Sequence, residues 1–308
     1  MSSQTAATPM IDVTVDGEVV QVPEGATLLD ACRTKGADTP TLCYLETLTP
    51  VNVCRVCVVE LEGSRTLVPS CSRAAYHGAV VETDSPRVRH SRKLVLELLA
   101  STVDLSRASG DVKRWMDRYD VDTARFGPAA APGERDGRDP GHHHASDGAT
   151  AETVAQPVKI HDEMYVRDYS KCILCYRCVE ACGEDAQNSF AIAVAGRGFD
   201  ARISTEFDRK LDQSACVYCG NCIGVCPTGA LVFKSEYDHR EAGTWDEAKQ
   251  NVTRTVCPYC GVGCNLELHV QANEIVKVTS PMDHSVTQGH LCIKGRFGWQ
   301  FVQNRGSE

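Results

Sequence analysis

Cysteine spacing constrains this 308-residue chain more than any other feature. Sixteen of its seventeen cysteines fall into four sets of four, and at least two members of each set are separated by only two residues. Cysteines this close form a disulfide only with strain, whereas four thiolates can ligate one metal centre. The spacing therefore predicts four metal centres rather than a disulfide scaffold. The four sets are Cys43, Cys54, Cys57 and Cys71; Cys172, Cys175, Cys178 and Cys182; Cys216, Cys219, Cys222 and Cys226; and Cys257, Cys260, Cys264 and Cys292.

Charge and apolar patterning favour a cytoplasmic protein with reduced thiols. Residues 1–10 form a polar tail, which we expect to be disordered, without the basic and apolar regions of an export signal. No apolar stretch approaches the roughly 20 residues that span a bilayer. The formal charge of −9 argues against broad binding of nucleic acid or anionic membranes. We therefore expect no membrane insertion and no nucleic-acid partner.

Residues 11–84 have the order of a β-grasp ferredoxin domain. Alternating valines predict two strands around the turn at Asp16-Gly17, and a helix should follow over 27–34 before a cysteine-rich loop. The first set, Cys43 to Cys71, is a C-x10-C-x2-C-x13-C pattern, and a cysteine pair inside a loop is typical of two-iron ferredoxins. We predict a [2Fe–2S] cluster here, with zinc as the alternative. Cys32 lies on the apolar side of the helix and is expected to be a core thiol.

Residues 85–126 should be a helical segment. Ser85-Pro86 is typical of a helix N-terminus, and the apolar residues that follow predict a helix to about Ala100. The helix begins with several basic residues, for which we expect a solvated face; contact with an acidic partner is the alternative. Residues 127–157 are rich in Gly, Pro and charge and predict a flexible linker. The histidines at 142–144 within it lack a second group of ligands.

Residues 158–240 contain two C-x2-C-x2-C-x3-C motifs, which predict a two-cluster [4Fe–4S] ferredoxin domain. In such motifs three cysteines hold one cube and the fourth ligates the other cube. We therefore assign Cys172, Cys175, Cys178 and Cys226 to one cluster, and Cys182, Cys216, Cys219 and Cys222 to the other. A polar connector around 236–251 should lead to the last domain, residues 252–308.

The fourth set, Cys257, Cys260, Cys264 and Cys292, leaves zinc and [4Fe–4S] open on spacing alone. Its surroundings, CPYCGVGC and CIKGRFG, resemble the opening [4Fe–4S] domain of molybdopterin oxidoreductases, above all cytoplasmic formate dehydrogenases. The resemblance implies a third [4Fe–4S] cluster. It also implies that Lys294 lies on an electron path to a pterin; a surface lysine without this role is the alternative.

The domain order resembles the N-terminal third of the alpha subunit of NAD-linked formate dehydrogenases, and its first domain resembles the large iron–sulfur subunit of complex I. An α+β fold of three iron–sulfur domains is implied, with one [2Fe–2S] and three [4Fe–4S] clusters. Relatives also bind a cluster through one histidine and three cysteines after the first domain. Residues 101–111 contain neither residue type, so we expect 85–126 to be a remnant without that cluster.

The resemblance implies an electron-transfer subunit that is not catalytic alone, since the chain carries none of the family's pterin-binding domains. A molybdopterin-containing catalytic subunit and a flavin subunit that binds NAD are the implied partners. One alternative is a ferredoxin-like subunit of an NAD-linked hydrogenase or of a complex I-type NADH:quinone oxidoreductase. The other is a zinc-stabilised scaffold that only bridges subunits.

Overall fold

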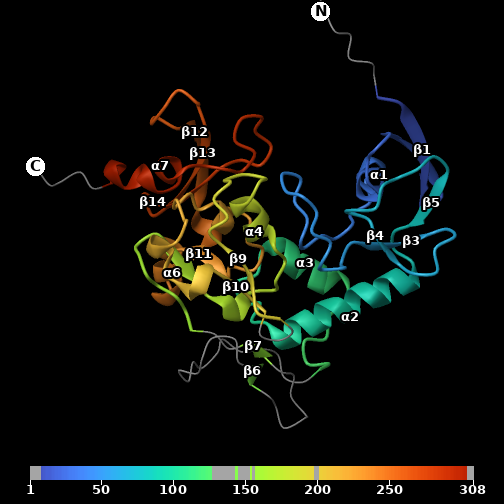
Figure 1. Ribbon diagram of the computed structural model, residues 1–308, viewed down its shortest axis with the longest axis horizontal. Coiled ribbons are helices and arrows are strands. Elements are labelled where there is room, and N and C mark those ends of the chain that lie inside the picture. Colours follow the sequence, from blue (N-terminus) through green and yellow to red (C-terminus); the bar gives the residue numbers. More distant parts are fainter. Residues whose placement is uncertain (1–7, 127–142, 145–152, 155–156, 198–200, 304–308) are drawn as a thin grey trace, which may run out of the picture.

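The computed structural model describes residues 8–126, 143–144, 153–154, 157–197 and 201–303. Figure 1 shows the N-terminal sheet and the C-terminal sheet on opposite sides of a central cysteine-rich part, with the long helix α2 running from the first sheet toward the centre. Residues 1–7 of the expected tail and most of the expected linker lie outside the described residues, whereas Met10, which was expected in the tail, begins the first strand. Two short strands, β6 (His143–His144) and β7 (Thr153–Val154), pair within the linker region.

The N-terminal domain is a five-stranded mixed sheet with strand order β2-β1-β5-β3-β4. Strand β1 pairs antiparallel with β2 and parallel with β5. The predicted turn is present, with Asp16 and Gly17 both at positive φ, as a two-residue hairpin requires. The alternating valines Val13, Val15 and Val22 are almost fully buried in the core beneath α1. The strands are β1 (Met10–Val15), β2 (Glu18–Pro23), β3 (Val58–Leu61), β4 (Val68–Pro69) and β5 (Ala79–Glu82).

Helix α1 (Leu28–Lys35) closes this sheet and is fixed at both ends by local chemistry. Thr27 and Asp30 form a reciprocal capping box, and Gly36 ends the helix in the left-handed conformation. Cys32 is fully buried in the core under the sheet, where burial raises the pKa of its thiol to about 11. The burial of Cys32 confirms the expectation that it is a core residue.

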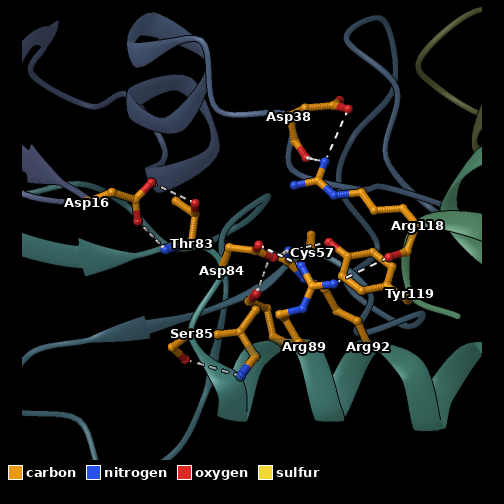
Figure 2. Close-up of polar contacts among 12 residues, drawn as sticks. Asp16, Asp38, Cys57, Thr83, Asp84, Ser85, Arg89, Arg92, Arg118 and Tyr119 are labelled. Atoms are coloured by element: carbon orange, nitrogen blue, oxygen red, sulfur yellow. Dashed lines mark hydrogen bonds and ion pairs between the residues drawn. The ribbon is translucent and has the colours of Figure 1, made fainter.

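Helix α2 (Pro86–Thr102) begins as predicted, because Ser85 accepts a hydrogen bond from the backbone N–H of Val88. The expected solvated basic face is wrong in one respect. Arg92 is 1% exposed and donates to the Tyr119 hydroxyl (2.7 Å) and the Val58 carbonyl (2.8 Å), as Figure 2 shows for Tyr119. Its basic neighbours pair with carboxylates of this chain, as Arg89 does with Asp84 at 2.8 Å. Internal partners thus offset positive charge at a helix N-terminus.

Helix α3 (Gly110–Arg118) and the loop before it pack on α2 and on the cysteine-rich loop of the first domain. Trp115, Val112 and Ala108 share an apolar cluster with Leu96 of α2 and Leu42. Residues 103–109 are therefore packed between the N-terminal and central domains.

The central domain repeats one unit twice: a cysteine loop, a short helix and a strand. Helix α4 (Arg177–Cys182) belongs to the first unit and α5 (Asn221–Gly224) to the second, and the two helices touch. Strands β8 (Tyr165–Arg167) and β11 (Leu231–Phe233) pair antiparallel, as do β9 (Ala193–Ala195) and β10 (Arg202–Ser204). Short 3-10 turns join these elements at Tyr169–Lys171, Glu206–Asp208 and Leu211–Gln213.

The expected polar connector is structured. Its first half is helix α6 (Lys234–Glu241), followed by a 3-10 turn at Glu247–Lys249. Glu236 of this helix pairs with Arg240 (2.7 Å) and with Lys277 of the last domain (2.9 Å). The Arg240 pair is local to the helix, but Lys277 comes from the separate strand of residues 274–279, so the polar composition alone did not reveal this support.

The last domain is an antiparallel meander with a short helix against it. Strands β12 (Asn251–Val256), β13 (Asn265–Gln271) and β14 (Glu274–Thr279) pair in chain order. Helix α7 (Ile293–Phe297) and the 3-10 turn Gly298–Val302 pack beside β14. Among the described residues, no helix is both long enough and apolar enough to cross a membrane.

Candidate metal centres

The first cysteine set meets in the loop beneath helix α1. The Sγ atoms of Cys57 and Cys71 lie 3.4 Å apart. Hydrogen bonds from Cys54 and Cys71 lower the pKa of the Cys43 thiol, and one from Cys71 lowers that of Cys57, while the same contacts raise the pKa of Cys54 and Cys71. The structure therefore gathers all four sulfurs. Since the thiolate is the ligating form, the donor set suits an iron centre.

The second and third sets line two separate small cavities in the central domain. One cavity is lined by Cys172, Cys175, Cys178 and Cys226 together with apolar residues. The other is lined by Cys182, Cys216, Cys219 and Cys222. The structure thus places the last cysteine of each motif with the first three of the other motif. This exchange follows from the contact between α4, which ends at Cys182, and α5, which ends just before Cys226.

Both motifs fold their loops in the same way. Leu174 and Tyr176 in the first loop, and Tyr218 and Gly220 in the second, adopt left-handed conformations at matching positions. In each loop a backbone N–H points at the first cysteine sulfur, from Leu174 to Cys172 and from Tyr218 to Cys216, both at 3.4 Å. Successive inward N–H groups form an anion-binding concavity. These loops therefore fit anionic cube clusters.

Burial is the largest influence on the pKa values of these thiols in the two cavities. It raises the pKa of Cys175 to about 12 and raises those of Cys172, Cys178 and Cys222 further, with neighbouring thiolates adding to the effect. A buried thiol ionises when a bound cation compensates its charge. A bound cluster would supply that charge and one-electron redox chemistry, while the protein sets solvent exposure and hydrogen bonds to sulfur.

Arg177 lies between the first set and the nearer cavity. Its Nη2 donates to the Tyr44 carbonyl at 2.6 Å, while its buried Nε has no hydrogen-bond partner among the described residues. Burial lowers the pKa of Arg177, and the thiolates of Cys175 and Cys43 act in the opposite direction. An unpaired buried donor beside these sulfurs fits a cluster with sulfur acceptors.

The fourth set lies at the edge of the last domain and faces outward. Cys257 is buried and its backbone N–H donates to the Cys264 carbonyl at 2.7 Å, which closes the turn between them. Burial, followed by the charges of Cys257, Cys260 and Cys292, raises the pKa of Cys264, so the four thiols are neighbours. Cys260 and Cys292 are exposed, as is Lys294. This set is the most solvent-accessible of the four.

Over the described part of the chain, no three His, Cys, Asp or Glu side chains have the spacing to hold a single metal ion. A cube cluster separates its thiolates further than one ion does, because iron and sulfide lie between them. The assignment of each set to a cluster stays a prediction.

Two functional candidates were missed by the sequence reasoning, Arg177 and Arg296. Both are arginines close in sequence to a predicted ligand, at Cys175 and Cys292 respectively. That proximity was the available signal. Their burial depends on contacts with other domains, which spacing does not show.

Comparison with known families gives the same domain order. The 2Fe-2S iron-sulfur cluster binding domain matches residues 8–86. The ferredoxin-like domain of NADH-quinone oxidoreductase subunit 3 matches residues 163–232. The molybdopterin oxidoreductase Fe4S4 domain matches residues 250–304. Domains of the 2Fe-2S and 4Fe-4S classes are therefore present, as the sequence predicts.

The chain is similar over 96% of its length to a G-type NADH-quinone oxidoreductase subunit of Rhizobium meliloti, with 35% identity over 298 residues covering 32% of that protein. The NADP-reducing hydrogenase subunit HndD of Solidesulfovibrio fructosivorans is 38% identical over 232 residues, which cover 72% of this chain and 36% of HndD. A putative formate dehydrogenase of Staphylococcus haemolyticus is 24% identical over 332 residues, with 95% and 31% coverage. The chain thus spans about a third of the length of these relatives.

A solved structure of an NAD⁺-reducing [NiFe]-hydrogenase in the H2-reduced state shares the fold. The TM-score is 0.55 at 23% identity, over 73% of this chain and 87% of that one. The sequence relatives, at 35% and 38% identity, and the matched domains show that the chain carries the N-terminal iron–sulfur portion shared by large subunits of NADH-quinone oxidoreductases, NAD-linked hydrogenases and formate dehydrogenases. The narrower identification as a formate dehydrogenase subunit stays a prediction.

Proposed function

We propose that this chain is the electron-transfer subunit of a formate dehydrogenase-like complex in the cytoplasm. It carries the N-terminal iron–sulfur portion that large subunits of NADH-quinone oxidoreductases, NAD-linked hydrogenases and formate dehydrogenases share. It holds one [2Fe–2S] and three [4Fe–4S] clusters in the four cysteine sets. Electrons enter at the Cys257 set and leave at the Cys43 set.

The observation that carries this proposal is that the four sets form a continuous series. Burial raises the pKa of Cys178, and the thiolate of Cys222 in the next cavity adds to that effect, so the two cavities are electrostatic neighbours. Cys43 of the first set acts in the same way on Cys175. At the other end, burial lowers the pKa of Arg296, and the thiolates of Cys222 and Cys292 both oppose that effect. Each centre therefore neighbours the next, which electron relay requires.

The exposed edge around the fourth set supports entry from a partner subunit. Val262 is 61% exposed, Ile293 40% and Tyr259 38%, and these residues lie in sequence beside the exposed Cys260 and Cys292. Apolar side chains beside an exposed centre fit a partner that covers it. We assign this partner as a molybdopterin-containing catalytic subunit, with Lys294 on the path to the pterin. The Cys43 set would then face a flavin subunit that binds NAD.

A second candidate is the corresponding subunit of an NAD(P)-linked hydrogenase or of an NADH:quinone oxidoreductase. The higher identities to HndD and to the Rhizobium protein, 38% and 35% against 24%, favour it. The matched molybdopterin oxidoreductase Fe4S4 domain at residues 250–304 supports a molybdopterin partner, although the match to the Rhizobium subunit also extends over this domain, because it covers 96% of this chain.

Anaerobic metal analysis of the full chain tests the cluster assignment. We expect about 14 iron atoms per chain, from one two-iron and three four-iron centres. Cys226→Ser should abolish the cube signal assigned to the Cys172 cavity and spare the first-set [2Fe–2S] signal. Cys32→Ser, a matched control outside the four sets, should keep all the iron. Predominant zinc would refute the proposal in favour of a structural scaffold.

Affinity purification from the native cell tests the partner. Copurification with a molybdenum- or tungsten-containing chain supports the formate dehydrogenase-like assignment. A nickel–iron or iron-only hydrogenase chain, or a quinone-reducing complex, would replace it with the second candidate. A stable monomer without any redox partner would contradict both.

A further inference from the structure

Arg296 lies wholly inside the protein, at the junction of the central and last domains. It is 0% exposed and projects from helix α7 into the cysteine loop that begins at Cys216. Its Nε donates to the Cys219 carbonyl at 3.1 Å, and its Nη2 donates to the Asn221 side-chain oxygen at 3.0 Å and to the Gly289 carbonyl at 3.3 Å. The guanidinium therefore joins the two domains through its hydrogen bonds to Cys219 and Asn221, while the bond to Gly289 lies within the last domain.

The central domain is shaped around this side chain. Gly220 has φ +71°, and a Cβ there would lie 2.4 Å from Cδ of Arg296. A Cβ at Gly224 would lie 3.4 Å from Nη1. The next residue, Phe297, packs edge-on against Tyr165 with ring centroids 5.3 Å apart. The loop at Gly220 therefore leaves room for the Arg296 side chain only because it has no Cβ there.

The charge of Arg296 has no carboxylate partner among the described residues. A buried cation is costly unless an anion compensates it. Burial lowers the pKa of Arg296, and the groups that oppose this effect are the thiolates of Cys219, Cys222 and Cys292, together with Tyr165. In addition, Nη1 is buried without a hydrogen-bond partner in the described chain. The anions that face this cation thus belong to two predicted cluster sites.

We propose that Arg296 is a positioning residue whose counter-ions are the two cluster sites on either side of it, the Cys182–Cys222 cavity and the Cys257–Cys292 set. It raises the reduction potentials of both clusters, because a fixed positive charge favours the form that has gained an electron. It also makes docking of the last domain depend on cluster loading, because without bound thiolates the guanidinium lacks an anion. The inference rests on the proposed cluster sites and is independent of the catalytic partner.

The first test is a redox titration of the iron-loaded full chain, followed by electron paramagnetic resonance with dithionite as the reductant. Each step adds one electron to a cluster and breaks no bond. Arg296→Met should lower the equilibrium constant for reducing both flanking clusters by about tenfold, which is about 59 mV for one electron. Arg296→Lys should recover much of this shift, because it retains the charge. Arg114→Met removes an exposed arginine and should leave both potentials unchanged.

Asn221→Asp is a sharper variant because it preserves size and packing. It places a carboxylate where the amide oxygen now lies, 3.0 Å from Nη2, and so supplies the missing anion. We expect lower potentials for the same two clusters. In the iron-free chain, we expect slower hydrogen exchange in residues 291–297 than in the iron-free wild type. Asn221→Asp should thus lower the potentials in the loaded chain and stabilise the junction in the iron-free chain. Simple damage to the junction would instead speed exchange in the iron-free chain.

One further test uses the wild-type chain and needs no variant. Hydrogen exchange in residues 291–297 should be at least tenfold slower with clusters loaded than without them. Equal exchange in the two forms would overturn the proposed dependence of docking on loading. Unchanged potentials in both Arg296→Met and Asn221→Asp, at full iron content, would overturn the inference and leave the proposed function standing. A chain that binds no iron would overturn both.

Discussion

The ion pair between Lys171 and Asp104 gives the most quantitative prediction, because both side chains are deeply buried. Lys171 directly precedes Cys172, and its ammonium contacts the carboxylate of Asp104 in the loop after α2. Their side chains are only 4% and 3% exposed. Burial raises the pKa of Asp104, but hydrogen bonds from Lys171 and the Ser106 backbone outweigh it, and the net pKa is lowered. The pair fastens this loop to the first cube site.

Lys171→Met should remove the cation and leave the Asp104 carboxylate buried without its main partner. Because almost no solvent reaches the site, we expect the full penalty for an uncompensated buried charge, about 3–5 kcal/mol. Asp104→Leu combined with Lys171→Met should cost much less, since an apolar pair of similar size can replace a buried ion pair. The Asp168 carboxylate, 3.5 Å from Nζ of Lys171, keeps its hydrogen bond from Ser170 in either variant.

Hydrogen exchange resolved to residues 103–109 and 165–172 measures this penalty as a local opening free energy. The matched control is Arg114→Met, whose pair with Asp38 is about half exposed and should cost less than about 1 kcal/mol. If Lys171→Met lowers the opening free energy no more than this control does, the reasoning from burial is refuted. A double variant as unstable as Lys171→Met would refute the role of the unpaired carboxylate.

Three further predictions concern other sites. Cys32→Ala should keep the wild-type iron content in an iron assay and lose about 1 kcal/mol of stability in thermal unfolding, because it removes one buried sulfur. Loss of two irons would make Cys32 a ligand. Arg177→Met, but not Arg177→Lys, should lower the potentials of the two-iron centre and the nearer cube in a redox titration; equal potentials in both variants would contradict its electrostatic role. Burial, with Lys277 nearby, lowers the pKa of His269 to about 4 from 6.5, so its stabilising contribution is complete above pH 6.5 and is lost as pH falls toward 4. Because His269 is partly exposed, we expect this contribution to the free energy of unfolding to be at most about 2 kcal/mol. As pH falls, the melting temperature of the wild type should drop more steeply than that of His269→Gln. Parallel plots of melting temperature against pH would contradict this expectation.

Local sequence rules predicted much of the fold correctly. The period-two valines located β1 and β2, and Asp16-Gly17 located their turn. The Ser85-Pro86 pair located the start of α2. Each of these signals acts within a few residues, so a single sequence contains all the information needed. The cysteines that the spacing groups in the central domain line shared cavities, and their assignment to clusters stays a prediction.

Features set by distant partners escaped the sequence. The burial of Arg92 depends on Tyr119, which is 27 residues away and on another element. Helix α6 is held in part by Lys277, 41 residues beyond Glu236. The buried position of Arg296 depends on a loop 75 residues earlier in the chain, at Asn221. Composition marks such basic side chains as surface residues, and only the assembled fold supplies the anions and carbonyls that let them lie inside.

The arrangement around Arg177 bears on how electrons could leave the central domain. The loop after α2 is packed through Asp104 and Ala108 against Lys171 and the apolar cluster of α2 and α3. Arg177 meanwhile holds the Tyr44 carbonyl at 2.6 Å, which fixes the Cys43 loop against the loop of Cys175. This hydrogen bond and the packed loop after α2 hold the two cysteine loops in one place. A fixed cation between the two sites would also favour the reduced form of both, so we infer that the cube of Cys175 and the two-iron centre have potentials that shift together when Arg177 is changed.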